Sequence, residues 1–382
     1  MKRLSTLPFL LLSGAAMLWA CGKKGVPDLA VGVIAELSGD IPAVGASCKS
    51  AAEMAVAELN EAGGVRVAGK DHLLRLEIED SKGTAAEAVE AAKRLVKDDK
   101  VLAIVGPNAS LGAVPAAQVA EDGKVSMISP WSTNPKTTAG KKWIFRACFT
   151  DAFEGHVLAK FATGYVQATK AAILYDPGSE APKSQAELFR KDFEDAGGKV
   201  VAFETYKTGD KDFTPQLGRI KAASPDLIFL PSYYNEVPLQ LQQAHKLGIN
   251  VRFLGSDNWS SPELVKSSGP DAEGATYCNH YSPDARVDAV ARFVAHYRNK
   301  FGQTPDDVAA LTYDSFMLLA KALSGAAKLD REAIRDALAK IRDFDGVTGR
   351  MTFKEGSGDP VKSAVMMKVE GGKPSFITNI DP

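Results

Sequence analysis

Short apolar runs alternate with longer amphipathic stretches along most of the chain. Ala30 to Ile34 is an apolar run of strand length, and Ser47 to Leu59 follows with apolar residues at helical spacing. The same alternation predicts further strands near 73–79, 101–105, 125–128, 171–175, 200–205, 226–230 and 251–254, and helices near 85–98, 183–197, 214–223 and 235–248. This order predicts a mostly parallel sheet covered by helices on both faces.

The alternation is interrupted at residues 145–151, 277–283 and 347–350. We interpret these breaks as crossings between two lobes, so the expected fold class is α/β, with two doubly wound lobes joined by three crossing segments. Two long helices are expected between the last two breaks, at about 286–300 and 307–325. The expected N-terminal lobe contains residues 28–148 and 282–348, and the C-terminal lobe contains residues 149–281 and 349–382.

The N-terminus has the pattern of an export signal. A basic head, Met1 to Arg3, precedes an apolar stretch, Leu7 to Leu18, which is too short to cross a bilayer. The stretch ends in Leu18-Trp19-Ala20-Cys21, which resembles a bacterial lipobox, and residues 1–20 would then be a lipoprotein signal peptide. We expect an exported protein anchored by lipid on Cys21 at the periplasmic face of the cell envelope. Ordinary cleavage near Ala20, giving a soluble secreted protein, is the alternative.

Charge and composition exclude several classes of function. The 46 Lys and Arg residues nearly balance the 47 Asp and Glu residues, and no basic run could follow a phosphate backbone, so nucleic acid is not an expected partner. The chain contains no Gly-x-Ser-x-Gly elbow, no His-Glu-x-x-His, no phosphate loop and no Rossmann glycine fingerprint. Its five histidines lack metal-ligand spacing. We therefore expect no enzyme activity, no metal site and no cofactor.

The remaining cysteines indicate no structural bridge. Besides Cys21 the chain has Cys48, Cys148 and Cys278, so at most one disulfide could form among them. The last two follow apolar runs of strand length, where a buried free thiol is the commoner state.

Polar residues follow two expected strands of the first lobe. Ser110 comes after the strand that ends at Val105, and a helix beginning near Ser110 would offer free backbone N–H groups to an anion. Ser132 and Thr133 follow the next strand, in a loop that Trp131 begins. Because ligands of parallel sheets lie outside the carboxyl ends of the strands, a carboxylate there could collect several donors. The alternatives are that Ser110 only caps its helix and that the loop is only structural.

The second lobe repeats this arrangement. Tyr233 follows the strand at 226–230, where it could cover an apolar ligand body while its hydroxyl stays in water. Asp257 follows the strand at 251–254 and could accept hydrogen bonds from an ammonium group. A core position for Tyr233 and a capping or turn role for Asp257 are the alternatives.

These loops and crossings together resemble the leucine/isoleucine/valine-binding family of solute-binding proteins, which has the type I periplasmic binding fold. The resemblance extends over about residues 29–370, and its strongest blocks are Met127 to Pro135, Asp212 to Pro215, Tyr313-Asp314 and Asp345 to Gly349.

The resemblance implies a role for each candidate residue. Ser110 and the loop of Trp131 and Thr133 fall on the family's contacts to the solute carboxylate, and Tyr233 and Asp257 fall on its contacts to the ammonium group. The sequence also departs from the family. Trp131 stands where branched-chain binders carry a small residue, Val44 stands where some relatives have tryptophan, Asp176 to Ala181 contains no tyrosine, and the disulfide partner of Cys48 falls on Ala109.

We therefore expect a lipid-anchored, monomeric solute-binding protein. It would capture an amino acid, branched-chain or related, by hinge closure and deliver it to the membrane permease subunits of an ABC importer. Because of Trp131, binding of a different small carboxylate, amide or aromatic acid stays open, as does a role as a solute sensor.

Overall fold

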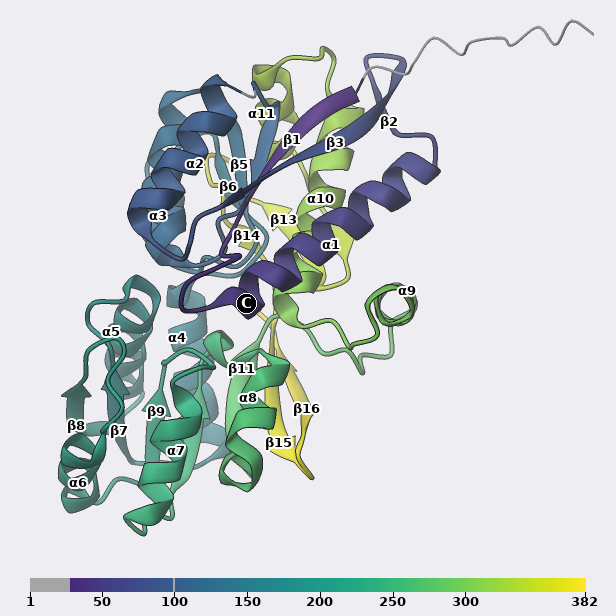
Figure 1. Ribbon diagram of the computed structural model, residues 1–382. Coiled ribbons are helices and arrows are strands. Elements are labelled where there is room, and N and C mark those ends of the chain that lie inside the picture. The colour runs from purple at the N-terminus through teal and green to yellow at the C-terminus, as the bar shows by residue number, and fades with distance from the viewer. Residues whose placement is uncertain (1–27, 99) are drawn as a thin grey trace, which may run out of the picture.

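The computed structural model describes residues 28–98 and 100–382, so the expected signal peptide and Cys21 lie outside the described residues. Two α/β lobes lie one above the other, and the chain crosses between them (Figure 1). The expected fold class is thereby confirmed. In the described part of the chain, no helix is long and apolar enough to cross a membrane.

The first lobe is built on a six-stranded sheet with the order β2-β3-β1-β4-β5-β6. Neighbouring strands are parallel except β2 and β3. The strands are β1 (Asp28–Ala35), β2 (Val65–Val67), β3 (Lys70–Asp80), β4 (Ala103–Val105), β5 (Ser126–Ser129) and β6 (Ile144–Arg146). Its helices are α1 (Pro42–Glu61), α2 (Ala85–Lys97), α3 (Ser110–Asp122), α9 (Asp288–Phe301), α10 (Asp307–Gly325) and α11 (Arg331–Ala339).

Successive side chains of β1 point to opposite faces of this sheet, and helices cover both faces. Val33 belongs to the core that includes residues of α1 and α10, whereas Ile34 belongs to the core formed with α2 and α3. Because side chains alternate along a strand, a continuous apolar run buries both faces at once.

The second lobe has a seven-stranded sheet with the order β16-β15-β11-β10-β9-β7-β8. Strands β7 to β11 are parallel, and β15 and β16 add an antiparallel hairpin that the sequence pattern had not predicted. The strands are β7 (Lys170–Tyr175), β8 (Lys199–Thr205), β9 (Leu227–Leu230), β10 (Arg252–Gly255), β11 (Thr276–Asn279), β15 (Ala364–Glu370) and β16 (Lys373–Ile380). The helices are α4 (Asp151–Lys160), α5 (Glu180–Asp195), α6 (Thr214–Ala223), α7 (Val237–Lys246) and α8 (Pro262–Ser268). This lobe also contains the short helical segments η2 (Phe161–Tyr165), η3 (Asp257–Trp259) and η4 (Gly269–Ala272), whereas the short segment η1 (Pro135–Thr137) lies between β5 and β6 of the first lobe.

The chain passes between the sheets after β6, after β11 and after a small third sheet of β12 (Phe344–Gly346), β13 (Gly349–Phe353) and β14 (Pro360–Val361). This small sheet packs on the first lobe, because the Phe353 ring meets Phe145 edge-on at 5.5 Å and Arg146 N donates to Gly358 O. The third passage therefore follows Val361, later than the sequence break at 347–350 had suggested.

The three described cysteines, Cys48, Cys148 and Cys278, are buried free thiols. Burial raises the pKa of Cys48 and of Cys148 to about 12. Both stay protonated at neutral pH, so they act as small core residues.

Candidate functional site

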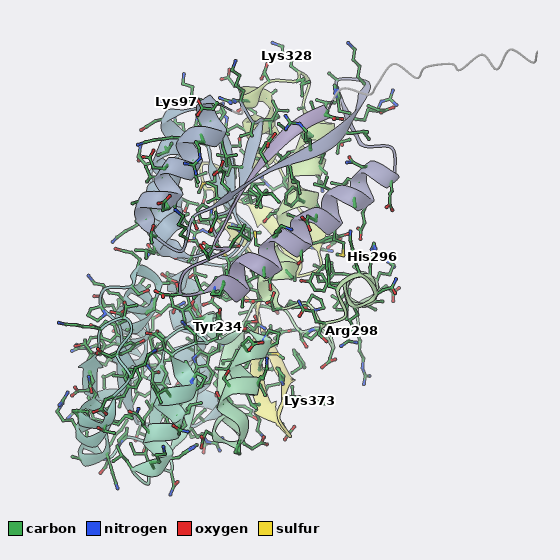
Figure 2. The ribbon with its side chains drawn as sticks, in the orientation of Figure 1. Lys97, Tyr234, His296, Arg298, Lys328 and Lys373 are labelled. Carbon is green, nitrogen blue, oxygen red and sulfur yellow. The ribbon has the colours of Figure 1, made fainter. Side chains whose placement is uncertain are left out.

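The candidate residues lie at the carboxyl ends of parallel strands, on the edges where the two lobes meet. Ser110 begins α3 after β4, and the loop of Trp131 to Thr133 follows β5. Tyr233 follows β9, and Asp257 follows β10 in η3. Tyr234, the neighbour of Tyr233, lies at the boundary between the lobes (Figure 2). This is the part of a parallel sheet where ligands bind.

The hydroxyl groups of the first lobe form a buried chain. Ser110 Oγ lies 2.9 Å from Ser132 Oγ, which lies 2.7 Å from Thr137 Oγ1. Ala109 is the N-cap of α3 and makes no side-chain capping bond, so the capping role considered for Ser110 is wrong. Ser110 instead connects the start of α3 to the loop after β5.

Glu36 occupies part of the anion site expected at the start of α3. Its carboxylate accepts the backbone N–H groups of Asn108 and Ala109, both at 3.0 Å, and the Asn108 side-chain amide at 2.9 Å. Those two backbone donors are therefore already used. Among the described residues, the N–H groups of Ser110 and Leu111 have no acceptor, so they are the donors of this helix that a solute carboxylate could reach.

Trp131 and Tyr233 connect the two lobes. Their ring centroids are 6.1 Å apart, with the planes inclined at 47°. The Trp131 indole N–H donates to Asp307 Oδ2 at 2.9 Å, which fixes the ring against α10. A cavity of about 150 Å³ lies beside this contact and is lined by both lobes, with Ala109 and Leu111 on one side and Ser179 and Tyr233 on the other.

Asp257 belongs to a buried polar network. Its Oδ1 accepts from Gln185 Nε2 at 2.8 Å, its Oδ2 lies 3.0 Å from His280 Nε2, and its backbone N–H donates to Glu154. Ser256, not Asp257, caps η3, so the capping alternative for Asp257 is wrong. Burial lowers the pKa of His280, which keeps the imidazole neutral, and the ring stacks on Phe149 at 3.8 Å.

Burial controls the ionisation of the acids in this region. It raises the pKa of Asp257 to about 7, and the bond from Gln185 opposes that shift. Burial also raises the pKa of Glu154, and the neighbouring Asp257 charge raises it further. A cation placed here would favour the ionised forms, because an opposite charge stabilises a buried carboxylate.

Asp151 is a second acid at the site, and it is not among the residues predicted from the sequence. It begins α4, its backbone N–H donates to Thr133 O at 2.8 Å, and burial raises its pKa to about 7. Both of its carboxylate oxygens are buried without a well-formed hydrogen bond to a described residue. Such a group is costly unless a partner arrives. The residue lies in the sequence break at 145–151, and that break was the available signal.

In the part of the chain that the structure describes, no group of three or more His, Cys, Asp or Glu side chains is arranged to hold a metal ion. Two of the buried acids, Asp257 and Glu154, are instead held by amide, imidazole and backbone groups.

Comparison with known proteins places the chain in a family. A family model described as periplasmic binding protein matches residues 28–373. The leucine-, isoleucine-, valine-, threonine-, and alanine-binding protein of Pseudomonas aeruginosa is 30% identical over 323 residues, which cover 84% of each chain. The leucine-binding protein LivK of Thermotoga maritima superposes with a TM-score of 0.87 at 33% identity, covering 93% of this chain and 99% of that one.

LivJ of Streptococcus pneumoniae, a branched-chain amino acid transporter substrate-binding protein solved in complex with isoleucine, superposes with a TM-score of 0.86 at 33% identity. The similarity covers 93% of this chain and 100% of that one. The chain therefore belongs to the periplasmic binding protein family, among its leucine/isoleucine/valine-binding members, which bind solutes and are not enzymes.

Proposed function

We propose that this protein captures an α-amino acid between its lobes and delivers it to an ABC importer. The observation that carries the proposal is the pair Asp257 and Asp151, which are buried near each other, each with a pKa raised to about 7. The Asp257 charge is one of the causes that raise the pKa of Asp151. A solute ammonium group placed between them would relieve both the burial cost and this repulsion.

The first lobe would hold the opposite end of the solute. The hydroxyl of Ser110 and the backbone N–H groups of Ser110 and Leu111 are the donors for a carboxylate, and Ser132 and Thr133 line the same edge. Charge-assisted hydrogen bonds of this kind contribute about 1.5–3 kcal/mol each. The named relatives that bind leucine, isoleucine and valine support an amino acid as the solute.

Closure of the two lobes would couple capture to delivery. The solute would contact both lobes only when they are closed, and it shifts the equilibrium by the difference between its affinities for the two states. Small-angle X-ray scattering with and without solute tests this step, and a smaller radius of gyration with solute is the expected result. Delivery is tested by comparing the uptake of radiolabelled solute in cells that carry the gene and in cells that lack it, and lower uptake without the gene is the expected result.

Trp131 supports a second candidate, an amide or a flat aromatic acid in place of an amino acid. Because Asp307 fixes the indole and Tyr233 faces it, the side-chain end of the site is narrower than a small residue at position 131 would leave it. A thermal-shift screen of amino acids, amides and aromatic acids separates the candidates, since a solute that binds only the folded protein raises its apparent stability. Stabilisation by aromatic acids or amides and by no amino acid would favour the second candidate.

The affinity for an amino acid should fall as the pH is lowered from 8.5 to 5.5. The solute ammonium stays protonated throughout this range, but Asp257, with a pKa of about 7, takes up a proton and loses the charge that attracts it. Protonation of this one group weakens binding by about thirty-fold at pH 5.5. Calorimetric titration at several pH values measures the effect, and circular dichroism at each pH controls for unfolding. An affinity that stays constant across the range would exclude an ionised Asp257 as the ammonium partner.

Replacing Cys21 with serine should release the protein from the membrane. Acylation of this cysteine would supply about 0.8 kcal/mol for each buried methylene group, and serine cannot accept the thioether-linked lipid. Cell fractionation and incorporation of radiolabelled palmitate measure the result, with Cys48→Ser as the matched control that keeps Cys21. Equal palmitate incorporation by the Cys21→Ser variant would contradict the lipid anchor.

A further inference from the structure

A second pocket lies on the first lobe, apart from the site between the lobes. It has a volume of about 410 Å³ and is formed by α1, α9, α10 and β12. Figure 1 shows α9 at the right-hand side of the molecule, below α1, and its residue Phe293 shares an apolar cluster with Met54 of α1. The volume falls in the range of about 300–1,000 Å³ that is typical of small-molecule sites.

The pocket is lined by apolar and aromatic side chains together with several charged ones. Phe293, Tyr313, Met317 and Phe344 all border it. The Phe293 and Tyr313 rings pack at 5.0 Å, so two walls support each other. An aromatic or branched aliphatic group would bury apolar surface against these side chains.

One side of the pocket is held in a fixed shape. Asp314 Oδ1 accepts the Val347 N–H at 2.8 Å, and Asp314 Oδ2 accepts the backbone N–H and the hydroxyl of Thr348 at 2.9 and 2.6 Å. Thr348 in turn accepts from Lys362 at 2.6 Å. Because these bonds fix the turn after β12, a ligand would bind a preformed surface and pay little to order it.

Among the charged side chains that line the pocket, the cation Arg292 forms no ion pair within the described residues. Glu58 accepts from the Tyr313 hydroxyl at 2.7 Å and also contacts the ring of His296, which lies on α9 and is labelled in Figure 2. Asp345 is paired with Arg350 at 2.8 Å. Arg292 also lines the pocket, and within the described residues it has neither an ion pair nor a hydrogen bond. Its guanidinium is suited to bind a carboxylate through two parallel hydrogen bonds.

We propose that this pocket binds a small carboxylate with an aromatic or branched apolar body, with Arg292 holding the carboxylate and the ring of Phe293 and the side chain of Met317 contacting the body. This site is separate from the one between the lobes and does not depend on the function proposed above.

Methyl NMR can test the site directly, because Met317 is one of its walls. The protein is labelled at its methionine methyl groups, the Met317 signal is assigned with Met317→Leu, and benzoate is titrated in as the probe. We expect a saturable shift of the Met317 signal in the low millimolar range. Arg292→Ala should weaken the interaction about three- to ten-fold. Benzamide, which has the same ring without the charge, should bind weaker than benzoate by a similar factor.

Three variants test whether the shift of the Met317 signal comes from binding in this pocket. Lys300→Ala, which removes a cation from α9 outside the pocket, should leave the titration unchanged. Ala289→Trp, which fills the pocket from α9, should abolish the shift. Asp257→Asn should keep it, because that residue belongs to the other site. The proposal is overturned if benzoate leaves the Met317 signal unmoved, or if Arg292→Ala and the parent titrate alike.

Discussion

Replacing Asp257 with asparagine should weaken amino-acid binding at least about a hundredfold. Asparagine keeps the size of the side chain and can still accept from Gln185, so the network around it is little disturbed. The negative charge is lost, however, and the solute ammonium would be buried without it. Removing one partner of a buried charge pair costs about 2–5 kcal/mol, and a hundredfold corresponds to about 2.7 kcal/mol.

Isothermal titration calorimetry with a solute found in the thermal-shift screen measures this loss. Asp195→Asn is the matched control, because Asp195 is an exposed acid on α5 in the same lobe and pairs with Lys191 at the surface. It should bind like the parent. Binding by Asp257→Asn within about threefold of the parent would remove Asp257 from the site, and Asp151 would then be the remaining acid to bind the ammonium.

The positions of the candidate residues were predictable from the sequence because they depend on a local rule. A buried apolar run followed by polar residues marks the carboxyl end of a strand, and parallel strands bring those ends to one edge. Ser110 and Asp257 follow from this rule alone, whereas Trp131 was added by the family resemblance. Glu36 obeys it too, directly after the run at 30–34, but its use by the start of α3 depends on a contact between residues far apart in sequence.

The partners of Asp257 could not be predicted in this way. Glu154 and Gln185 lie on α4 and α5, and His280 lies on the crossing after β11. They meet Asp257 only because the two helices pack together beside the end of β10, and no periodicity in the chain records that packing. The terminal hairpin of β15 and β16 was missed for a related reason. It continues the second sheet by antiparallel pairing, whereas the alternation of strands and helices predicts only parallel neighbours.

Arg146 should be among the side chains that contribute most to stability, and the sequence pattern gave no sign of its role. It is fully buried at the end of β6, and its Nε lies 2.6 Å from Asp359 Oδ1. Its guanidinium also donates to the carbonyl oxygens of Ser132 and Asn134 and to the Thr138 hydroxyl. It therefore ties the loop that carries Trp131 and Thr133 to the segment before the third crossing.

Arg146→Met should lower the free energy of unfolding by about 3–5 kcal/mol, because it removes the charged donor of two buried carbonyl oxygens and leaves the Asp359 carboxylate with the Thr138 hydroxyl but without its cation. Urea denaturation measures the loss. Arg66→Met, at an exposed arginine of β2, should change the free energy by less than about 0.5 kcal/mol. Arg146→Lys should fall between the two, since lysine keeps the charge but not the planar fork that reaches several acceptors. If Arg146→Met instead unfolds at the same urea concentration as the parent, the loop is held by its own hydroxyl and backbone bonds, and the site does not need the buried guanidinium.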